Sequence, residues 1–207
     1  MSRRRICRIM REKGLVSAYA RTRFKPHPPK ANAADVPNIV NRELDGRPPR
    51  THIVSDLTYV RAGARWCYIC LLIDLYNREI VGHSAGERKD ARLVKSAFAT
   101  LDFPLDEIEV FHTDRESGFD NAAIDELLEA FGIKRSLSSR GCPYDNSVDE
   151  STNKILKAEF VYRESFPTLR DLQVKLGDYV HWYNHFRLHS TLGYMSPVEF
   201  RLAGLTL

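Results

Sequence analysis

Residues 52–84, HIVSDLTYVRAGARWCYICLLIDLYNREIVGHS, decide the fold class of this 207-residue chain. They contain three strand-like runs, at 52–60, 66–75 and 78–84, separated by short polar breaks. The middle run is almost continuously apolar, which is typical of a strand that is covered on both faces. Because short connections join antiparallel neighbours, this stretch predicts a three-stranded meander.

Helical and strand patterns alternate after this stretch. The next two helices each begin at a residue that can cap them, Asp90 and Asn121, and two more strand patterns complete a β-β-β-α-β-α-β order. A later amphipathic helix begins at Thr168, with Asp171 three residues on. We therefore expect an α/β fold, with helices at 90–101, 121–131, 145–162 and 168–186 and further strands at 108–113 and 133–137.

Two segments of different composition precede the α/β pattern. Ile6, Ile9 and Met10 lie at helical spacing among arginines, which predicts one short basic helix. The following stretch is rich in proline and has little apolar periodicity. We accordingly divide the chain into a basic helical segment (1–25), a linker (26–50) and an α/β core with a helical tail (51–207).

The composition limits the class of protein. Hydrophobic residues make up 43% of the chain and charged residues 28%. No apolar run approaches the ~18 to 20 residues that a membrane span needs. We therefore exclude a membrane protein and a wholly disordered chain. Since no apolar stretch follows the arginines at 3–5, a secretory signal is not expected, and we predict a cytoplasmic protein.

Charge is distributed unevenly along the chain. The overall net charge is +4, but residues 1–50 carry +9 and residues 51–207 carry −5. A basic arm can lie on phosphates while an acidic body uses its carboxylates for another purpose. The alternative at this point is a solvated, partly disordered tail.

Two further patterns have the residue types of metal sites. Cys67 and Cys70 form a C-x-x-C, but three positions along a strand place them on opposite faces, so we expect core thiols. His181, His185 and His189 recur every four residues, which would suit Zn²⁺ on a continuous helix. No H-E-x-x-H accompanies them, and the helix is expected to end near Arg187.

Three carboxylates stand out by their positions. Asp56 lies within the first predicted strand, Asp114 ends the fourth, and Glu150 lies in the first turns of the helix after the fifth. If the first and fourth strands are neighbours, the three side chains can converge. Converging carboxylates repel one another unless cations lie between them, and Mg²⁺ has this role in phosphoryl transfer.

Each carboxylate also has a simpler interpretation. Asp56 could be a strand-edge charge, Asp114 a turn residue, and Glu150 the third residue of a capping box that begins at Ser147. On its helix Glu150 shares a face with Lys154 and Lys157, opposite Val148, Ile155 and Tyr162. The two lysines could hold a polyanion over a metal, or Glu150 and Lys154 could form an ordinary surface pair.

Four ordered motifs resemble bacterial insertion-sequence transposases with a retroviral-integrase-type (DDE) core. They are SDLTY at 55–59, HTD at 112–114, YDNSVDES at 144–151, and YN at 183–184 followed by HSTLGYMSP at 189–197. Asp114 and Glu150 are separated by 35 residues, the spacing that is typical of this family's acidic triad.

The resemblance implies a ribonuclease H-like fold, with a mixed five-stranded sheet flanked by helices. It also implies that Asp56, Asp114 and Glu150 are the catalytic residues and bind two Mg²⁺ or Mn²⁺ ions. In such enzymes one ion activates water or a DNA 3′-hydroxyl, and the other stabilises the leaving oxygen. No covalent bond between protein and DNA is implied.

The resemblance further implies double-stranded DNA, both transposon ends and target, as the partner. Expected DNA contacts are Lys154 and Lys157, with Asn146 and Tyr144 positioning either the catalytic helix or the DNA. The arm would add phosphate contacts from Arg3, Arg4, Arg5 and Arg8. Synapsis of two ends would require at least a dimer, and relatives also use a helix-turn-helix protein from an upstream reading frame.

Three features depart from the family pattern. Glu116 occupies a position that is usually glycine, so it either weakens the site or points away. Asp149 replaces a small residue, and because one helical residue turns a side chain by ~100° we expect it to point away from the site. The chain also begins within what resembles the last helix of a helix-turn-helix region, so residues 1–25 would be a remnant of that region.

Three functions follow as hypotheses. The leading one is a metal-dependent DNA strand-transferase that cuts at a transposon end and joins the 3′-hydroxyl to a target phosphate. The second is a catalytically silent DNA-binding fragment that modulates full-length transposase. The third is a structure-selective nuclease of the same fold class, which the motif at 183–197 disfavours.

Overall fold

The computed structural model describes residues 2–15, 36–116, 118–119, 121–139 and 143–207. Its centre is a five-stranded sheet in the order β3-β2-β1-β4-β5. The first three strands pair antiparallel, whereas β4 and β5 run parallel to β1, so the predicted mixed sheet is confirmed. The strands are β1 (His52–Ala62), β2 (Arg65–Asp74), β3 (Ile80–Gly86), β4 (Val110–Thr113) and β5 (Lys134–Leu137).

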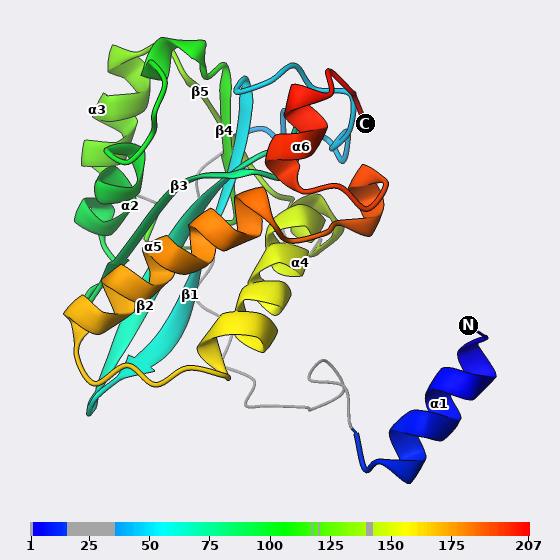
Figure 1. Cartoon of the computed structure of the whole chain (residues 1–207). Helices are drawn as coiled ribbons and strands as arrows, with labels where there is room; N and C mark the ends of the chain where they lie inside the picture. Colours follow the sequence, from blue (N-terminus) through cyan, green and yellow to red (C-terminus); the bar gives the residue numbers. More distant parts are fainter. Residues whose placement is uncertain (1, 16–35, 117, 120, 140–142) are drawn as a thin grey trace.

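Helices cover both faces of the sheet (Figure 1). The helices of the described residues are α1 (Arg3–Glu12), α2 (Ala91–Phe98), α3 (Ala122–Ala130), α4 (Ser147–Leu156), α5 (Leu169–His185) and α6 (Pro197–Leu202), of which α2 to α5 pack against the sheet. One apolar cluster joins the sheet to α2 and α3, and the other joins it to α4 and α5. Cys67 belongs to one cluster and Cys70 to the other, and both are buried free thiols, as the strand pattern predicted.

Local signals explain where most of the helices begin. Asp90 caps α2 and Asn121 caps α3, each through its side chain. Thr168 and Asp171 form the predicted capping box at the start of α5. These side-chain bonds satisfy backbone N–H groups that have no partner within the helix.

The helix expected at 145–162 differs from the prediction. A 3-10 turn (Pro143–Asn146) precedes α4, and a π-helical turn (Lys157–Val161) follows it. This turn brings the Phe160 ring to 5.0 Å from the rings of both Phe166 and Tyr179, measured between centroids. Tyr162, expected on the apolar face, is exposed.

The segment from 36 to 50, which we assigned to the linker, lies against the core. Val40 is buried in the cluster beneath α4 and α5. Asn38 and Arg42 donate hydrogen bonds to the buried carboxylate of Asp145 over 2.9 and 2.8 Å, and Arg78 forms an ion pair with Asp45. The core therefore extends toward residue 36, because polar contacts from distant elements hold this proline-containing stretch.

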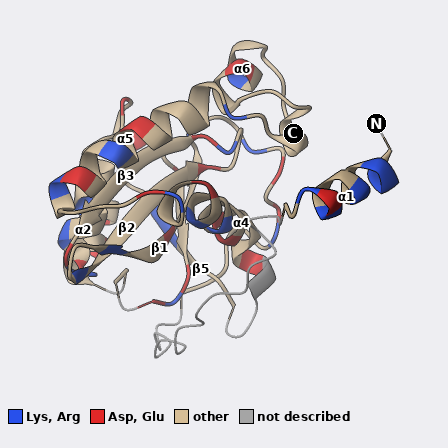
Figure 2. Ribbon diagram, turned by 60° about the horizontal axis from the view of Figure 1, so that its bottom comes forward, with Lys and Arg blue, Asp and Glu red and all other residues tan. Residues whose placement is uncertain are grey.

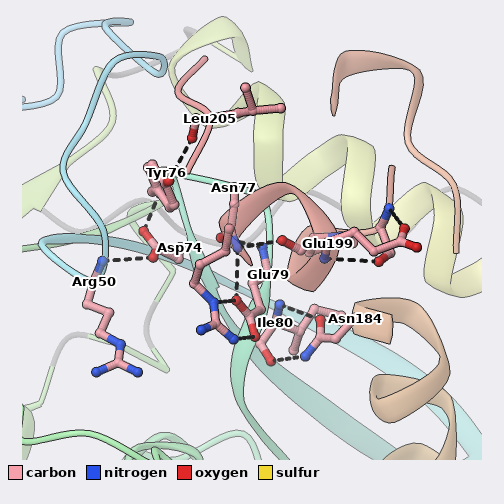
Figure 3. A network of polar contacts seen from close by, with 12 residues as sticks. Arg50, Asp74, Tyr76, Asn77, Glu79, Ile80, Asn184, Glu199 and Leu205 are labelled. Atoms are coloured by element: carbon pink, nitrogen blue, oxygen red, sulfur yellow. Dashed lines mark hydrogen bonds and ion pairs between the residues drawn. The ribbon is translucent and has the colours of Figure 1, made fainter. Parts of the chain in front are cut away.

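Hydrogen bonds hold the C-terminal region against the turn between β2 and β3 (Figure 3). The Tyr76 hydroxyl donates to the carbonyl of Leu205 over 2.6 Å, and the Asn77 amide donates to the carbonyl of Pro197 over 3.0 Å. From α5, the Asn184 side chain accepts from the N–H of Ile80 and donates to its C=O, both over 2.9 Å. This part of the YN motif therefore has a structural role.

Candidate metal centre

Asp56 and Asp114 meet because β1 and β4 are parallel neighbours. Ser55 of β1 lies opposite Thr113 of β4, so the residues that follow them, Asp56 and Asp114, are neighbours at the same end of the two strands. Carboxylate oxygens of Asp56, Asp114 and Glu116 lie within 4.8 Å of one another, the one group of potential metal ligands found in the described part of the chain. The strand-edge interpretation of Asp56 fails, since β1 is the central strand.

The two aspartates are held in place by hydrogen bonds. Asp56 accepts one from the N–H of Leu57 and one from the amide of Asn153 on α4, each over 2.7 Å. Asp114 accepts from the N–H of Glu116 over 2.9 Å. Asn153 was not predicted from the sequence, although it lies one helical turn after Asp149 and therefore on the same face of the helix.

Burial and mutual repulsion both disfavour negative charge here. Burial raises the pKa of Asp56 to about 6, with the charge of Glu116 as the next cause. Burial also raises the pKa of Asp114 to about 8, followed by the charges of Asp56 and Glu116. A cation between these groups would favour their ionised forms.

Glu116, one of the departures from the family pattern, faces the cluster rather than away from it. Its carboxylate forms an ion pair with Lys89, and both side chains are mostly buried. The extra carboxylate is therefore partly neutralised within the protein.

The α4 helix buries the carboxylate of Asp149, the neighbour of Glu150. Asp149 is only 1% exposed, and neither of its carboxylate oxygens has a hydrogen-bond partner. Its pKa is raised by burial and then by the charges of Asp56, Asp114 and Glu150. The expectation that Asp149 points away from the site is therefore wrong, because the buried face of α4 consists of Asp149, Thr152, Asn153 and Leu156.

Glu150 lies at the rim of the site. Its side chain is 44% exposed and pairs with Lys154 over 3.8 Å, while Glu150 is outside the cluster of Asp56, Asp114 and Glu116. The capping-box interpretation also fails, since α4 begins after Asn146 and its first turn has no side-chain cap. The Glu150–Lys154 pair is one of the two alternatives considered for this face of the helix.

The second predicted lysine, Lys157, has a different environment. Its ammonium lies 4.9 Å from the centroid of the Tyr59 ring. Burial lowers the pKa of Lys157, while the charges of Asp56 and Glu116 oppose this shift. Lys157 is therefore close enough to the acidic cluster to interact with it electrostatically.

Asn146 connects the start of α4 to β4. Its side-chain oxygen lies 2.8 Å from Nε2 of His112, whose Nδ1 lies 2.8 Å from the hydroxyl of Ser136 on β5. His112 and the buried Asp145 were not singled out from the sequence. Of the two roles considered for Asn146, these contacts favour positioning of the helix. The Tyr144 side chain is outside the described residues.

The predicted basic residues of the arm lie on α1. Ser2 caps this helix, and its residues are exposed or only partly buried. Figure 2 shows more blue than red along α1, whereas blue and red alternate along α5. Arg3, Arg4, Arg5 and Arg8 thus belong to a basic helix, with Arg8 in an i,i+4 pair with Glu12.

The histidine pattern forms no metal site among the described residues. His181 and His185 stack within α5, with ring centroids 4.2 Å apart. His189 lies beyond the end of that helix, with its ring against Tyr183.

Comparisons with known proteins agree with this geometry. Two family models, both described as integrase core domain, match residues 47–143 and 131–197. The chain is 30% identical over 195 residues to transposase InsF for insertion sequence IS3A of Escherichia coli, which covers 92% of this chain and 67% of the relative. The chain belongs to the insertion-sequence transposases with an integrase core.

Other relatives match similar parts of this transposase. It is 29% identical over 201 residues to the transposase for insertion sequence element IS904 of Lactococcus lactis, covering 95% of this chain and 79% of the relative. It is 32% identical over 208 residues to the probable transposase for IS1353 of Shigella flexneri, covering 98% of this chain and 40% of that longer relative.

Solved structures show the fold of this transposase. The HTLV-2 integrase catalytic core domain in complex with magnesium matches with a TM-score of 0.56 at 16% identity, covering 73% of this chain and 96% of that one. The catalytic core domain of BIV integrase matches with a TM-score of 0.52 at 16% identity, covering 75% and 95%. The predicted ribonuclease H-like fold is thus confirmed. No helix within the described residues is long and apolar enough to cross a membrane.

Proposed function

We propose that this transposase cleaves DNA at transposon ends and transfers the freed 3′-hydroxyl to a phosphate of target DNA. The observation that carries the proposal is the convergence of the Asp56 and Asp114 carboxylates at the ends of two parallel strands, within one acidic group. Membership in the transposase family supports the same chemistry.

The donor set of the site fits divalent metal ions. Carboxylate oxygens are preferred ligands of Mg²⁺, and oxygens of Asp56 and Asp114 already lie within 4.8 Å of each other in the acidic group. Asp56, Asp114 and Glu150 are the residues proposed to hold two Mg²⁺ or Mn²⁺ ions. When bound, the ions would supply activation of water or a 3′-hydroxyl and stabilisation of the leaving oxygen.

The residues of the chain have separate tasks in this proposal. Asn153 fixes one oxygen of Asp56, and the N–H of Glu116 fixes one oxygen of Asp114, which keeps both carboxylates oriented. Lys154 and Lys157 offset phosphate charge next to the site, and the basic α1 adds sequence-independent phosphate contacts. The proposal includes the cytoplasmic location that the sequence predicts.

Nicking and joining of supercoiled plasmid with Mn²⁺ tests the proposal. We expect wild-type protein to form nicked and joined products, and Asp114→Asn and Glu150→Gln to lose them with unchanged circular dichroism. Glu129→Gln, on the exposed face of α3, is the matched control and should retain activity. Activity in an Asp114→Asn, Glu150→Gln double variant would contradict the proposal.

A second candidate, a silent DNA-binding protein that modulates full-length transposase, rests on the position of Glu150. This residue is half-exposed, pairs with Lys154 and lies outside the acidic group. If wild type and Glu150→Gln both bind DNA in a salt-dependent way without cleaving it, this second function is favoured. In either case synapsis of two ends requires an oligomer on DNA, with an upstream-frame helix-turn-helix protein as a further proposed partner.

A further inference from the structure

A groove of about 760 Å³ lies between the β1–β2 hairpin and the turn that follows α4. Its volume is within the range of ligand-binding pockets. Of the site residues predicted from the sequence, Lys157 belongs to it. The side chains that matter for its chemistry are Tyr59, Arg61, Trp66, Lys157, Tyr162 and Phe166.

Aromatic rings form an accessible surface in this groove. Trp66 is 53% exposed although it is a large apolar side chain at the start of β2. Its ring meets Tyr59 edge-on, with centroids 5.4 Å apart. Because more than half of Trp66 is exposed, part of its ring remains accessible to a planar ligand.

Two cations lie over these rings. The Lys157 ammonium is 4.9 Å from the centroid of Tyr59, and the Arg61 guanidinium is 5.9 Å from that of Trp66. Among the residues that line the groove, Glu164 is the one carboxylate, and it pairs with Lys175 over 2.6 Å. The groove is therefore positively charged as well as aromatic.

The groove adjoins the acidic cluster. Lys157 lines the groove, and its ammonium also interacts with the charges of Asp56 and Glu116. Along β1, Tyr59 is three residues, or about 10 Å, beyond Asp56, so the two side chains leave the strand on opposite faces, and Lys157 links the two sites through its contact with the Tyr59 ring. A DNA strand with one phosphate at the cluster would thus have neighbouring nucleotides at the groove.

We propose that this groove binds unpaired nucleotides of the DNA strand being processed, with bases stacked on Trp66 and phosphates facing Arg61 and Lys157. The proposal rests on the DNA-cleaving function proposed above. Aromatic platforms flanked by cations bind single strands with little sequence preference. Paired bases are already stacked on each other, so intact duplex could offer the groove only its phosphates.

Tryptophan fluorescence tests this binding site. The chain has two tryptophans, so Trp182→Phe leaves Trp66 as the single reporter. We would titrate this variant with an oligothymidylate of about ten nucleotides in EDTA. Saturable quenching of Trp66 is expected, and in parallel fluorescence-anisotropy titrations with labelled oligonucleotide Trp66→Ala should weaken binding by about tenfold relative to wild type. Arg61→Glu, which keeps the ring, should weaken binding as well.

Trp182→Ala is the matched control. Trp182 is similarly exposed, at 42%, but lines a groove with the carboxylates of Glu159, Glu164 and Asp178. This variant should bind the oligonucleotide as wild type does. Equal losses in Trp66→Ala and Trp182→Ala, binding without Trp66 quenching, or equal competition by blunt duplex would each overturn the proposal. Because EDTA removes catalysis, a failure here is distinguishable from a failure of plasmid cleavage.

Discussion

Asp56→Asn should stabilise the metal-free protein while it abolishes cleavage. Asp56 is buried next to Asp114 and Glu116, so at neutral pH its charge opposes folding when no cation is present. Asparagine has nearly the same shape and is neutral. Its oxygen can still accept from the N–H of Leu57, as the carboxylate does.

The pKa shift of Asp56 sets the size of the stability gain expected for Asp56→Asn. Burial raises this pKa from 3.8 to about 6, and each pKa unit corresponds to ~1.4 kcal/mol of differential stability. The Asp56 charge therefore lowers the free energy of unfolding by about 3 kcal/mol at most. We expect Asp56→Asn to regain about 2 kcal/mol of this. The contact with Asn153 need not be lost, because its buried side-chain oxygen has no partner and could accept from the new amide after rotation.

The stability difference between wild type and Asp56→Asn should depend on pH in a characteristic way. Below about pH 4 both folded and unfolded wild type carry a protonated Asp56, so the charge has no effect. Between about pH 4 and 6 the unfolded chain ionises first, and wild type loses stability relative to the variant. Above about pH 6 the difference should grow further until Asp114, whose pKa of about 8 is raised in part by the Asp56 charge, has also ionised.

Urea unfolding in EDTA, followed by circular dichroism at about pH 4 and about pH 7.5, measures this difference. Mg²⁺ at about a hundred times its dissociation constant should then stabilise wild type by ~2.7 kcal/mol but leave Asp56→Asn almost unchanged. Glu129→Gln, whose side chain is exposed on α3, should match wild type throughout.

A variant less stable than wild type at about pH 7.5 in EDTA would refute the reasoning. The same conclusion would follow if the difference between the two proteins were equal at both pH values, because a packing effect does not titrate.

Three further predictions concern stability and are measured by urea unfolding. Arg187→Met removes a two-point ion pair with Glu159, at 2.7 and 3.0 Å between mostly buried side chains, and should cost about 2 kcal/mol; an unchanged midpoint would contradict it. Gly82→Ala would place a methyl group 2.7 Å from the carbonyl oxygen of Ala97 and should cost about 2 kcal/mol or more, whereas a neutral result would show that the backbone yields. Thr168→Val removes the cap of α5 and should cost about 1 kcal/mol, with a loss under about 0.3 kcal/mol arguing against the capping box.

Elements with strong local signals could be predicted from the sequence. Asp90, Asn121 and Thr168 mark the starts of helices through short-range hydrogen bonds, which depend little on the rest of the fold. The meeting of Asp56 and Asp114 could also be predicted, because it needs only that β1 and β4 are parallel neighbours.

The orientation of α4 could not be predicted in the same way. Its buried face includes polar side chains, Asp149, Thr152 and Asn153, so hydrophobic periodicity does not identify it. Asp149 and Glu150 are adjacent, and a rotation of ~100° decides which of them faces the cluster. The packing of residues 36–50 against the core could not be predicted either, because it depends on Asp145 and other groups far away in the sequence.

The two hydrogen bonds between Asn184 and Ile80 have a consequence for how the protein avoids aggregation. β3 is one of the two outer strands of the sheet, and its free backbone groups could template pairing with another copy. At Ile80 the Asn184 amide takes the place of a neighbouring strand's peptide group, and α5 packs along β3. A chain truncated before α5 would uncover this strand, so we expect such a product to self-associate even though all five strands remain.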